Sequence, residues 1–364
     1  MHGRVVLRFR RWLLSLTIVL GVCYHSLISH RAIYGRSRTT RSEMTSTRGQ
    51  QTSLTSRYVT LCQARLHGNH RTGNHLFLLA GMLYAAQLTG REVSMPAGGW
   101  LLDDTFQLDE IDRYQTGPNC PYHEFADPPK AIFYHGDDNL DTSEGRTALQ
   151  KNMNRTLGLC GLYQTYRYAD AVAPTLRTLL RFRPEVLDAA HKILEDGRPP
   201  EWAAGSYHRV GLHIRRGDFL DRQWAEYGFS VVNRRFVVNA VDYFASKFAR
   251  FQLVVASDDP CWIGAVLREK FSPASTSSPS RFMSMTGHSV AVTLSRGQSA
   301  AVDLALLAAC DAMVVSTTSS FGWWAAWLVN STTVFYDRWS RVGSRFSRDF
   351  DYHRYFPPHW IPLH

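Results

Sequence analysis

The chain has 364 residues, of which 45% are hydrophobic and 20% charged, enough to bury a substantial core in one large or two modest domains. Its formal net charge is +10, but residues 1–57 hold ten arginines and one acid, while residues 58–364 hold 31 basic and 30 acidic residues. The predicted folded part is therefore close to neutral, which removes the main support for a nucleic-acid partner.

An apolar run at residues 12–29 follows four arginines and is long enough to span, or nearly span, a bilayer. We interpret residues 1–11 as a cytoplasmic tail, 12–29 as the transmembrane signal anchor of a single-pass type II protein, and 30–57 as a stem linker rich in Ser, Thr, Arg and Gly. A cleaved signal peptide and a mitochondrial transit peptide are the alternatives. The run lacks an Ala-x-Ala cleavage site and is too continuous for an amphipathic transit peptide.

Four arginines precede the run and four follow it closely (Arg31, Arg36, Arg38 and Arg41), so its orientation depends on other features. Asn-x-Ser/Thr sequons at Asn154 and Asn330 are usable only if the body of the protein is lumenal. Six cysteines show no CxxC spacing and no zinc signature. We expect Cys310 to be a buried free thiol, and the sequence leaves any disulfide pairing open.

The first predicted half of the folded part covers residues 58–204. Its apolar patterns predict strands at 58–62 and 92–95, a helix from Gly73 through Leu88, and one continuous helix over 174–195. Residues 96–160 are rich in proline and acidic residues and give no clear prediction.

The second predicted half, residues 205–364, alternates strands with helices. Strands are expected at 209–214, 252–257, 312–316 and 332–336, and helices at 234–249, 261–270, 299–311 and 320–329, with a surface loop at 272–280. This alternation predicts a parallel, doubly wound α/β sheet.

A histidine and two arginines end the first strand of this half. Apolar residues alternate with His213 and Arg215, and Gly217 permits a sharp turn at the strand's carboxyl end, where open α/β sheets bind ligands. Arginine binds phosphate oxygens bidentately, so Arg215 with His213 could bind a pyrophosphate. One alternative is a solvated basic loop. Another is cell adhesion through the integrin-type tripeptide Arg216–Gly217–Asp218, although a buried strand is a poor platform for display.

Two further strands are expected to end at the same edge. After the strand at 252–257, Asp258 could accept hydrogen bonds from guanine, and the alternative is that Asp258 or Asp259 only caps the next helix. After the strand at 312–316, five consecutive hydroxyl residues precede a helix start, which is typical of an anion site, although spare capping serines would look similar. We expect Trp323, Trp324 and Trp327 to pack in the core.

Three segments carry a resemblance to a known family. His213–Asp218 matches the HxRRxD-like motif of the α-1,2/α-1,6/protein-O-fucosyltransferase superfamily, and Ser316–Trp327 resembles its threonine-rich segment followed by Phe-Gly-x-Trp-Ala-Ala. Gly73–Asn74 resembles the Arg-x-Gly-Asn-Gln motif, with His75 in place of Gln and Thr72 where Leu is common. Over residues 58–340 the chain thus resembles the galactoside α-1,2-fucosyltransferases.

The resemblance implies a GT-B-like fold of two Rossmann-like halves, GDP-fucose as donor, inversion at the anomeric carbon and no required metal or other cofactor. Carried onto matching positions, it implies donor contacts in the C-terminal half and Asn74 near the reacting sugar. The implied donor-binding residues are His213, Arg215 and Arg216, Asp258 on guanine, and Thr317, Thr318, Ser319, Ser320 and Phe321 around the phosphates.

The residues themselves also indicate that no metal is required. The only DxD sequence, Asp349–Asp351, lies outside the sheet pattern, so arginine must offset the charge on departing GDP. We expect a Golgi enzyme that moves L-fucose to the 2-hydroxyl of a terminal galactose on a glycan, with Arg215, His213, Asp218 and Asn74 as catalytic residues. Asp218 is either the base or a structural partner of Arg216. The alternatives are a protein-O-fucosyltransferase, another fucosyl linkage, or a non-catalytic glycan-binding or adhesion protein.

Overall fold

The computed structural model describes residues 58–61, 71–97, 101–115, 131–134, 139–151, 153, 155–273, 281–283, 288–316, 319–338 and 340–364. The predicted tail, anchor and stem lie outside the described residues, and so do Asn154, Thr317 and Thr318. Among the helices within these ranges, none combines the length and the hydropathy of a membrane span.

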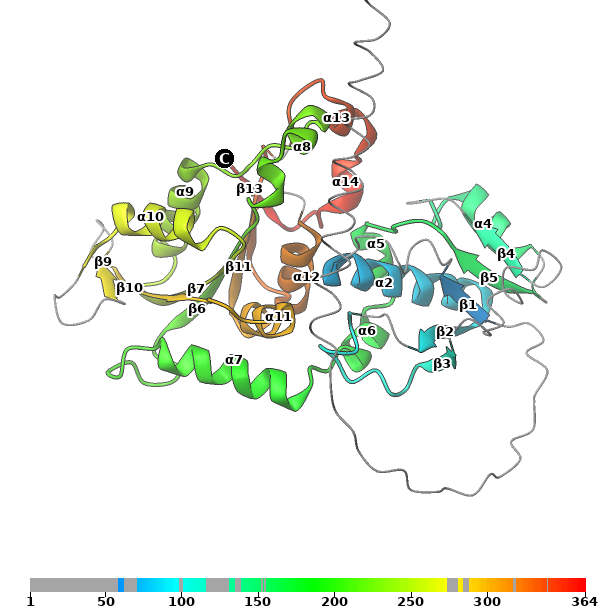
Figure 1. Cartoon of the computed structure of the whole chain (residues 1–364), viewed down its shortest axis with the longest axis horizontal. Helices are drawn as coiled ribbons and strands as arrows, with labels where there is room; N and C mark the ends of the chain where they lie inside the picture. Colours follow the sequence, from blue (N-terminus) through cyan, green and yellow to red (C-terminus); the bar gives the residue numbers. More distant parts are fainter. Residues whose placement is uncertain are drawn as a thin grey trace, which may run out of the picture. The chain divides into compact units, whose positions relative to one another are not determined.

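The N-terminal part of the described chain forms a parallel sheet (Figure 1). Within the described residues its strand order is β3-β2-β1-β5-β4. The strands are β1 (Tyr58–Leu61), β2 (Glu92–Ala97), β3 (Asp112–Gln115), β4 (Ala131–Tyr134) and β5 (Thr156–Leu159). Residues 96–160, which gave no clear prediction, contain three of these strands and the helix α4 (Ser143–Gln150).

The C-terminal part forms a second sheet, with the order β13-β12-β11-β6-β7-β10-β9-β8 in the part of the chain that the structure describes. All neighbours pair in parallel except at β9, which pairs antiparallel with β8 and β10. The strands are β6 (His208–Ile214), β7 (Arg250–Ser257), β8 (Ser272–Pro273), β9 (Arg281–Met283), β10 (Ser289–Leu294), β11 (Ala312–Val315), β12 (Thr333–Tyr336) and β13 (Ile361–Leu363).

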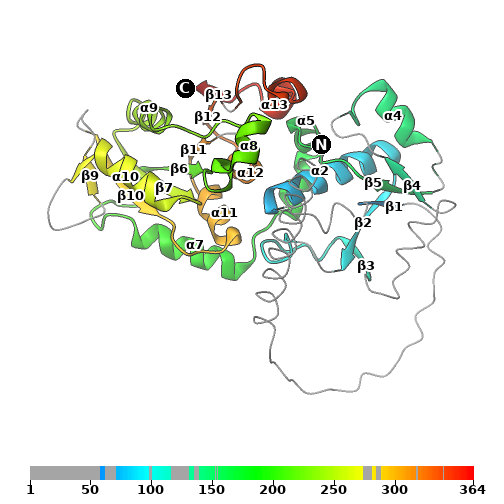
Figure 2. The ribbon, with the colours of Figure 1, turned by 45° about the horizontal axis from the view of Figure 1, so that its top comes forward.

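Helices cover both faces of this second sheet, as Figure 2 shows. Helices α9 (Arg234–Ala245) and α10 (Pro260–Lys270) pack on Leu212, Ile214 and their neighbours. Helix α11 (Ala300–Ala308) packs on the opposite face, together with α7 (Pro184–Asp196) from the predicted first half. The sheet is therefore doubly wound, as its alternating strands and helices predict.

Helix α2 (Thr72–Thr89) is buried along most of its length and joins the two parts of the core. It packs on β1 and β2 of the first sheet and on α12 (Ser320–Val329) of the second. Phe77 of α2 lies 4.6 Å from the ring of Trp323 and 5.1 Å from that of Trp324. Both tryptophans are fully buried and Trp327 is 5% exposed, which confirms their predicted place in the core.

The predicted continuous helix over 174–195 is wrong. The segment forms α6 (Ala173–Leu179) and, after a break, α7. The residue before a proline avoids the helical conformation, and Arg183 before Pro184 is extended, with ψ 144°. In the break, Phe182 forms an antiparallel bridge with Phe106, whose ring lies 4.8 Å away.

The remaining described α-helices have four to six residues each. They are α5 (Tyr166–Ala171), α8 (Arg222–Tyr227), α13 (Arg345–Asp349) and α14 (Tyr352–Tyr355). Of the predicted strands and helices of this half, all form with shifts at their ends, whereas α8, β8, β9, β10, α13, α14 and β13 had no sequence prediction. Strand β8 occupies the first two residues of the segment predicted as a surface loop, 272–280, and residues 274–280 lie outside the described residues. Cys310 is a free, buried thiol, as expected.

Candidate active site

The topological switch point of the second sheet lies between β6 and β11, because later strands add on both sides of β6. His213 is in register with Val315 of β11 on one side and Ala256 of β7 on the other. Beyond the strand ends, Ser316 joins the two segments: its hydroxyl accepts the N–H of Arg215 at 2.8 Å, and its own N–H donates to the His213 carbonyl at 3.1 Å. The predicted motif therefore starts where ligands of open α/β sheets bind.

The imidazole of His213 is buried and neutral. Burial and, to a smaller extent, the charge of Arg215 lower its pKa to about 3. Its ring centroid lies 5.3 Å from that of Phe321, and its Nδ1 has no hydrogen-bond partner among the described residues. A neutral imidazole with an unused ring nitrogen can donate or accept one further hydrogen bond at this point.

Arg215 is oriented by Asp218. Its Nε donates to Asp218 Oδ1 at 3.0 Å, its Nη2 binds Oδ2, and its guanidinium lies 5.0 Å from the ring of Phe219. Asp218 also lies 3.5 Å from Arg71, just before α2. Burial opposes ionisation of Asp218, but the hydrogen bond and charge of Arg215 outweigh it, so the pKa of Asp218 lies below its ordinary value. The alternative in which Asp218 is a structural partner of Arg216 is wrong in its partner, since the carboxylate binds Arg215.

Arg216 is engaged within the fold. Its Nε donates to Asp259 at 3.2 Å, its Nη1 donates to the Val232 carbonyl at 3.0 Å, and its guanidinium lies 4.0 Å from the ring of Trp262. Its backbone N–H donates to Asp258 Oδ1 at 2.7 Å. Asp259, rather than Asp258, caps α10. The alternative interpretation of this acid pair as a helix cap therefore holds for Asp259, while Asp258 fixes the turn after β6.

Helix α12 begins beside His213. The first N–H groups of a helix have no partner within it, and together with the helix dipole they favour an anion. Ser319 is the N-cap residue, yet its buried hydroxyl makes no capping bond and has no hydrogen-bond partner within the described ranges. A Cβ on Gly322 would come 2.4 Å from His213 Nδ1, so the close approach of helix and imidazole requires glycine there.

The beginning of α2 meets the beginning of α12. A Cβ on Gly73 would lie 2.5 Å from the backbone N of Phe321, so only glycine permits this contact. Next to it, Asn74 Oδ1 accepts the hydroxyl of Ser320 and the Nε2 of Gln164, each at 2.8 Å. His75, which departs from the family motif, is 2% exposed and points into the core, where its Nδ1 accepts the N–H of Leu101 at 3.3 Å.

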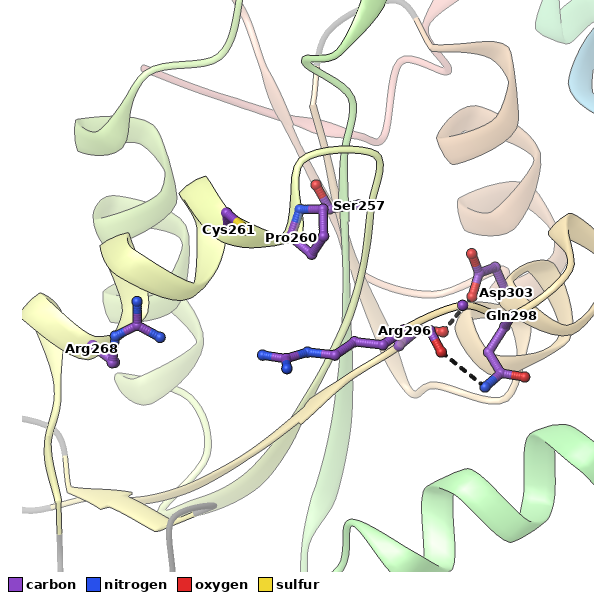
Figure 3. Close-up of a pocket in the computed structure, with 9 residues that line it drawn as sticks. Ser257, Pro260, Cys261, Arg268, Arg296, Gln298 and Asp303 are labelled. Atoms are coloured by element: carbon purple, nitrogen blue, oxygen red, sulfur yellow. Dashed lines mark hydrogen bonds between the residues drawn. The ribbon is translucent and has the colours of Figure 1, made fainter.

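A pocket of about 410 Å³ opens at the same sheet edge, beyond β7 and β10. Figure 3 shows Arg296 extended across it, with Ser257 and Cys261 on one side and Asp303 on the other. Asp303 accepts the Ser295 hydroxyl at 2.5 Å. Burial raises the pKa of Asp303, and this hydrogen bond opposes the rise only in part.

The structure brings together His213, Arg215, Asp218 and Asn74, together with Ser319, Ser320 and Phe321 at the start of α12. Asp258 and Arg216 lie at the edge of this group and are bound to each other. Sequence reasoning missed Asp303 and Gln164. A lone carboxylate within the apolar helix Ala300–Ala308 was a signal for Asp303, whereas Gln164 carried none.

Comparisons with known proteins point to the family that the sequence motifs resemble. The model of glycosyl transferase family 11 matches residues 202–364. The galactoside 2-alpha-L-fucosyltransferase SEC1 of Bos taurus is 29% identical over 156 residues, which are 42% of this chain and 38% of that protein. The galactoside alpha-(1,2)-fucosyltransferase 1 of Bos taurus is 23% identical over 302 residues, which are 80% of this chain and 74% of that protein.

Among solved structures, a mutant of Arabidopsis thaliana FUT1 in complex with GDP superposes with a TM-score of 0.54 at 13% sequence identity. The superposition covers 81% of this chain and 76% of that one. These matches confirm the resemblance stated from the sequence motifs and the GT-B-like α/β fold. The likeness to glycosyltransferases is the one that the sequence motifs predicted.

Proposed function

We propose that this chain, of which residues 202–364 match the model of glycosyl transferase family 11, is an inverting transferase that moves L-fucose from GDP-β-L-fucose to the 2-hydroxyl of a terminal galactose on a glycan. The observation that carries the proposal is the meeting of Arg215, His213 and the first turn of α12 at the switch point of the sheet. The names of the bovine relatives supply the fucosyl group and the linkage.

The diphosphate would bind between the guanidinium of Arg215 and the start of α12. There the free N–H groups of the first turn and the Ser319 hydroxyl are the partners, while the buried Nδ1 of His213 faces Gly322 of the same turn. As the bond to fucose breaks, negative charge grows on the departing GDP while the sugar becomes oxocarbenium-like. Arg215 stabilises that charge, and its bidentate contact with Asp218 holds the guanidinium in place before the reaction.

We further propose that transfer needs no metal ion, because Arg215 and the helix N-terminus already supply positive potential at the leaving group. Asp218 is a poor general base, since its lowered pKa leaves it little affinity for the proton of the acceptor hydroxyl.

The base of the nucleotide would enter the pocket beside β7 and β10. Adjacent strands lie about 4.8 Å apart, so this pocket is roughly 10 Å from the switch point, a gap that a ribose bridges. Asp303 lines the pocket and Asp258 does not, so Asp303 is better placed than Asp258 to accept hydrogen bonds from guanine. A carboxylate that accepts from both N1–H and the 2-amino group distinguishes GDP from inosine diphosphate, which lacks that amino group. We expect Asp303→Asn to abolish the preference for GDP and Asp258→Asn to keep it.

The membrane placement is also a proposal: a Golgi type II protein with its catalytic part in the lumen. It is supported by the arginines before the apolar run at 12–29 and by the sequon at Asn330, which is exposed at the end of α12. If the proposal holds, the mobility of the expressed chain shifts on enzymatic deglycosylation, and Asn330→Gln reduces that shift. A chain without N-glycans would contradict it.

The decisive experiment measures transfer of labelled fucose from GDP-fucose to a panel of β-galactosides, with the full chain in detergent and EDTA present. The expected product carries an α-1,2 linkage, Arg215→Ala abolishes it, and Arg222→Ala, at a 91% exposed side chain, does not. GDP binding without product on any galactoside would favour a protein acceptor or another linkage. Absence of GDP binding would overturn the proposal.

The adhesion alternative requires the tripeptide Arg216–Gly217–Asp218 to be displayed. The side chain of Arg216 is 16% exposed and bound to Asp259, and Asp218 is bound to Arg215. An integrin-type receptor needs both charges free, so this geometry favours the enzyme.

A further inference from the structure

The turn after β5 contains a residue in a rare conformation. Tyr163 has φ 56°, the left-handed region that residues other than glycine seldom adopt, and it is fully buried. Its hydroxyl accepts the N–H of Gly161 at 3.0 Å, and its ring lies so close to α2 that a Cβ on Gly81 would come 2.7 Å from it. Such backbone strain persists only where the surrounding packing holds it, and it is concentrated at functional sites.

The strained turn delivers the next side chain to the active site. Gln164, 90 residues away from Asn74 in sequence, donates its Nε2–H to Asn74 Oδ1 at 2.8 Å. The Ser320 hydroxyl, at the start of α12, reaches the same oxygen at 2.8 Å. One carbonyl oxygen of an asparagine therefore receives hydrogen bonds from two distant parts of the chain.

Of these two partners, Gln164 determines which way the Asn74 amide faces. The oxygen and the NH₂ group of an amide are nearly equal in size, so packing alone hardly distinguishes the two orientations. The turned-over orientation would place the Asn74 NH₂ against the NH₂ of Gln164, which can only donate, whereas the Ser320 hydroxyl could rotate to accept. The two N–H groups of Nδ2 are consequently held on the opposite edge of the amide.

We propose that Gln164 is a positioning residue for sugar transfer: it holds the Asn74 amide so that Nδ2 donates to an oxygen of the bound nucleotide sugar. The inference rests on the proposed function, which places the donor at the meeting point of α2 and α12. Gln164 does not touch the substrate and acts through Asn74. Tyr163 holds the turn that brings Gln164 within reach.

The test replaces the donor without changing the size of the side chain. Gln164→Glu presents a carboxylate oxygen to Asn74 Oδ1, so the amide turns over, and we expect kcat to fall about tenfold or more. The affinity for GDP and the melting temperature should stay close to those of the unmodified chain, because the fold and the phosphate site are intact. Gln107→Glu is the matched control: Gln107 Nε2 donates to the Phe182 carbonyl at 3.1 Å, away from the site, so this variant should keep its kcat.

A double-mutant cycle separates positioning from an independent role. In the Asn74→Ala background, Gln164→Ala should cause no further loss of kcat, because the group through which it acts is gone. An unchanged kcat for Gln164→Glu, or losses that multiply in the double variant, would overturn the inference. If the unmodified chain transfers no fucose from GDP-fucose to any acceptor, the proposed function itself fails, and that outcome is recognised before any variant is made.

Discussion

At the scale of single residues, the neutral His213 makes stability depend on pH. Its pKa in the folded chain is about 3, against an ordinary 6.5, so between these values the unfolded chain binds a proton that the folded chain does not. Stability therefore rises with pH across this window and falls on acidification. From pH 7 to pH 5 we expect His213 to account for a loss of about 2 kcal/mol in the free energy of unfolding.

Chemical denaturation at pH 7 and pH 5 checks this expectation. His213→Gln should show a smaller loss than the unmodified chain, by about the amount attributed to the imidazole. His208→Gln is the matched control, since His208 is exposed at the other end of the same strand. Equal losses in the unmodified chain and in His213→Gln would contradict a buried neutral imidazole.

Asp218 gives a second prediction at this scale. Since its pKa is lowered below the ordinary 3.8, the carboxylate stays charged at every pH above that value, and the stability it provides is lost only as the pH falls below it. Asp218→Asn should reduce kcat by roughly ten- to a hundredfold, because Arg215 loses its orienting partner. The pH profile between 6 and 8 should keep its shape. A pH limb present in the unmodified enzyme and absent in the variant would instead identify Asp218 as the base.

At the scale of elements, the contact between the starts of α2 and α12 depends on two glycines. A Cβ at Gly73 would meet the backbone of Ser320 and Phe321 at 2.5 Å, and one at Gly322 would meet the His213 ring at 2.4 Å. Backbone cannot move aside as a flexible side chain can. We therefore expect Gly73→Ala to lower the free energy of unfolding by about 1–3 kcal/mol and to abolish transfer.

Gly264→Ala is the control for that variant. Gly264 lies within α10, and its nearest neighbour to an added Cβ is the end of the Arg268 side chain at 3.5 Å. Alanine favours a helix over glycine by up to about 1 kcal/mol, so this variant should be as stable as the unmodified chain or more stable. Thermal denaturation compares the three chains. Equal melting temperatures for Gly73→Ala and Gly264→Ala would show that the two helices do not need to touch.

The elements that the sequence predicted correctly are those whose own residues specify them. Strands β6, β7 and β11 are apolar runs that end in turn residues, and α10 starts with an aspartate cap and a proline. The helix expected over 174–195 is wrong because its periodicity continues across Pro184, while the pairing of Phe182 with Phe106, 76 residues earlier, interrupts it. Such a pairing depends on the tertiary fold and leaves no local pattern.

At the scale of the whole molecule, the site likewise combines residues that a local sequence pattern predicts with residues that only the tertiary fold brings there. His213, Arg215 and the serines before α12 were predictable, because a strand end or a helix start gives each of them a local reason to be there. Gln164 and Asp303 were not. Gln164 matters only because the fold places it against Asn74, and Asp303 only because β10 forms beside β7.

The C-terminal segment also acts at this scale, because it returns to the first sheet's part of the core. Arg354 of α14 binds Asp141 at 2.5 Å, and its carbonyl accepts the Thr165 hydroxyl at 2.5 Å. Next to it, the Tyr355 carbonyl accepts the indole N–H of Trp323 at 2.8 Å. Burial opposes the charge of Asp141, but Arg354 and then Arg167 outweigh it, so the pKa of Asp141 lies below its ordinary value.

Removing this ion pair should loosen the C-terminal segment far more than removing an exposed one. The two side chains are only 17% and 13% exposed, so Arg354→Met leaves a largely buried carboxylate with a single cationic partner, and we expect a loss of about 2 kcal/mol in the free energy of unfolding. Arg345→Met is the matched variant in the same segment: its pair with Asp349 is 73% and 54% exposed and should contribute no more than about 0.5 kcal/mol. Urea denaturation at pH 7 measures both losses. As the pH falls from 3.8 through the lowered pKa of Asp141, Arg354→Met should converge on the unmodified chain, because protonation of Asp141 removes the interaction that the substitution deletes. Equal losses for the two variants at pH 7 would mean that the segment is held by its aromatic contacts alone.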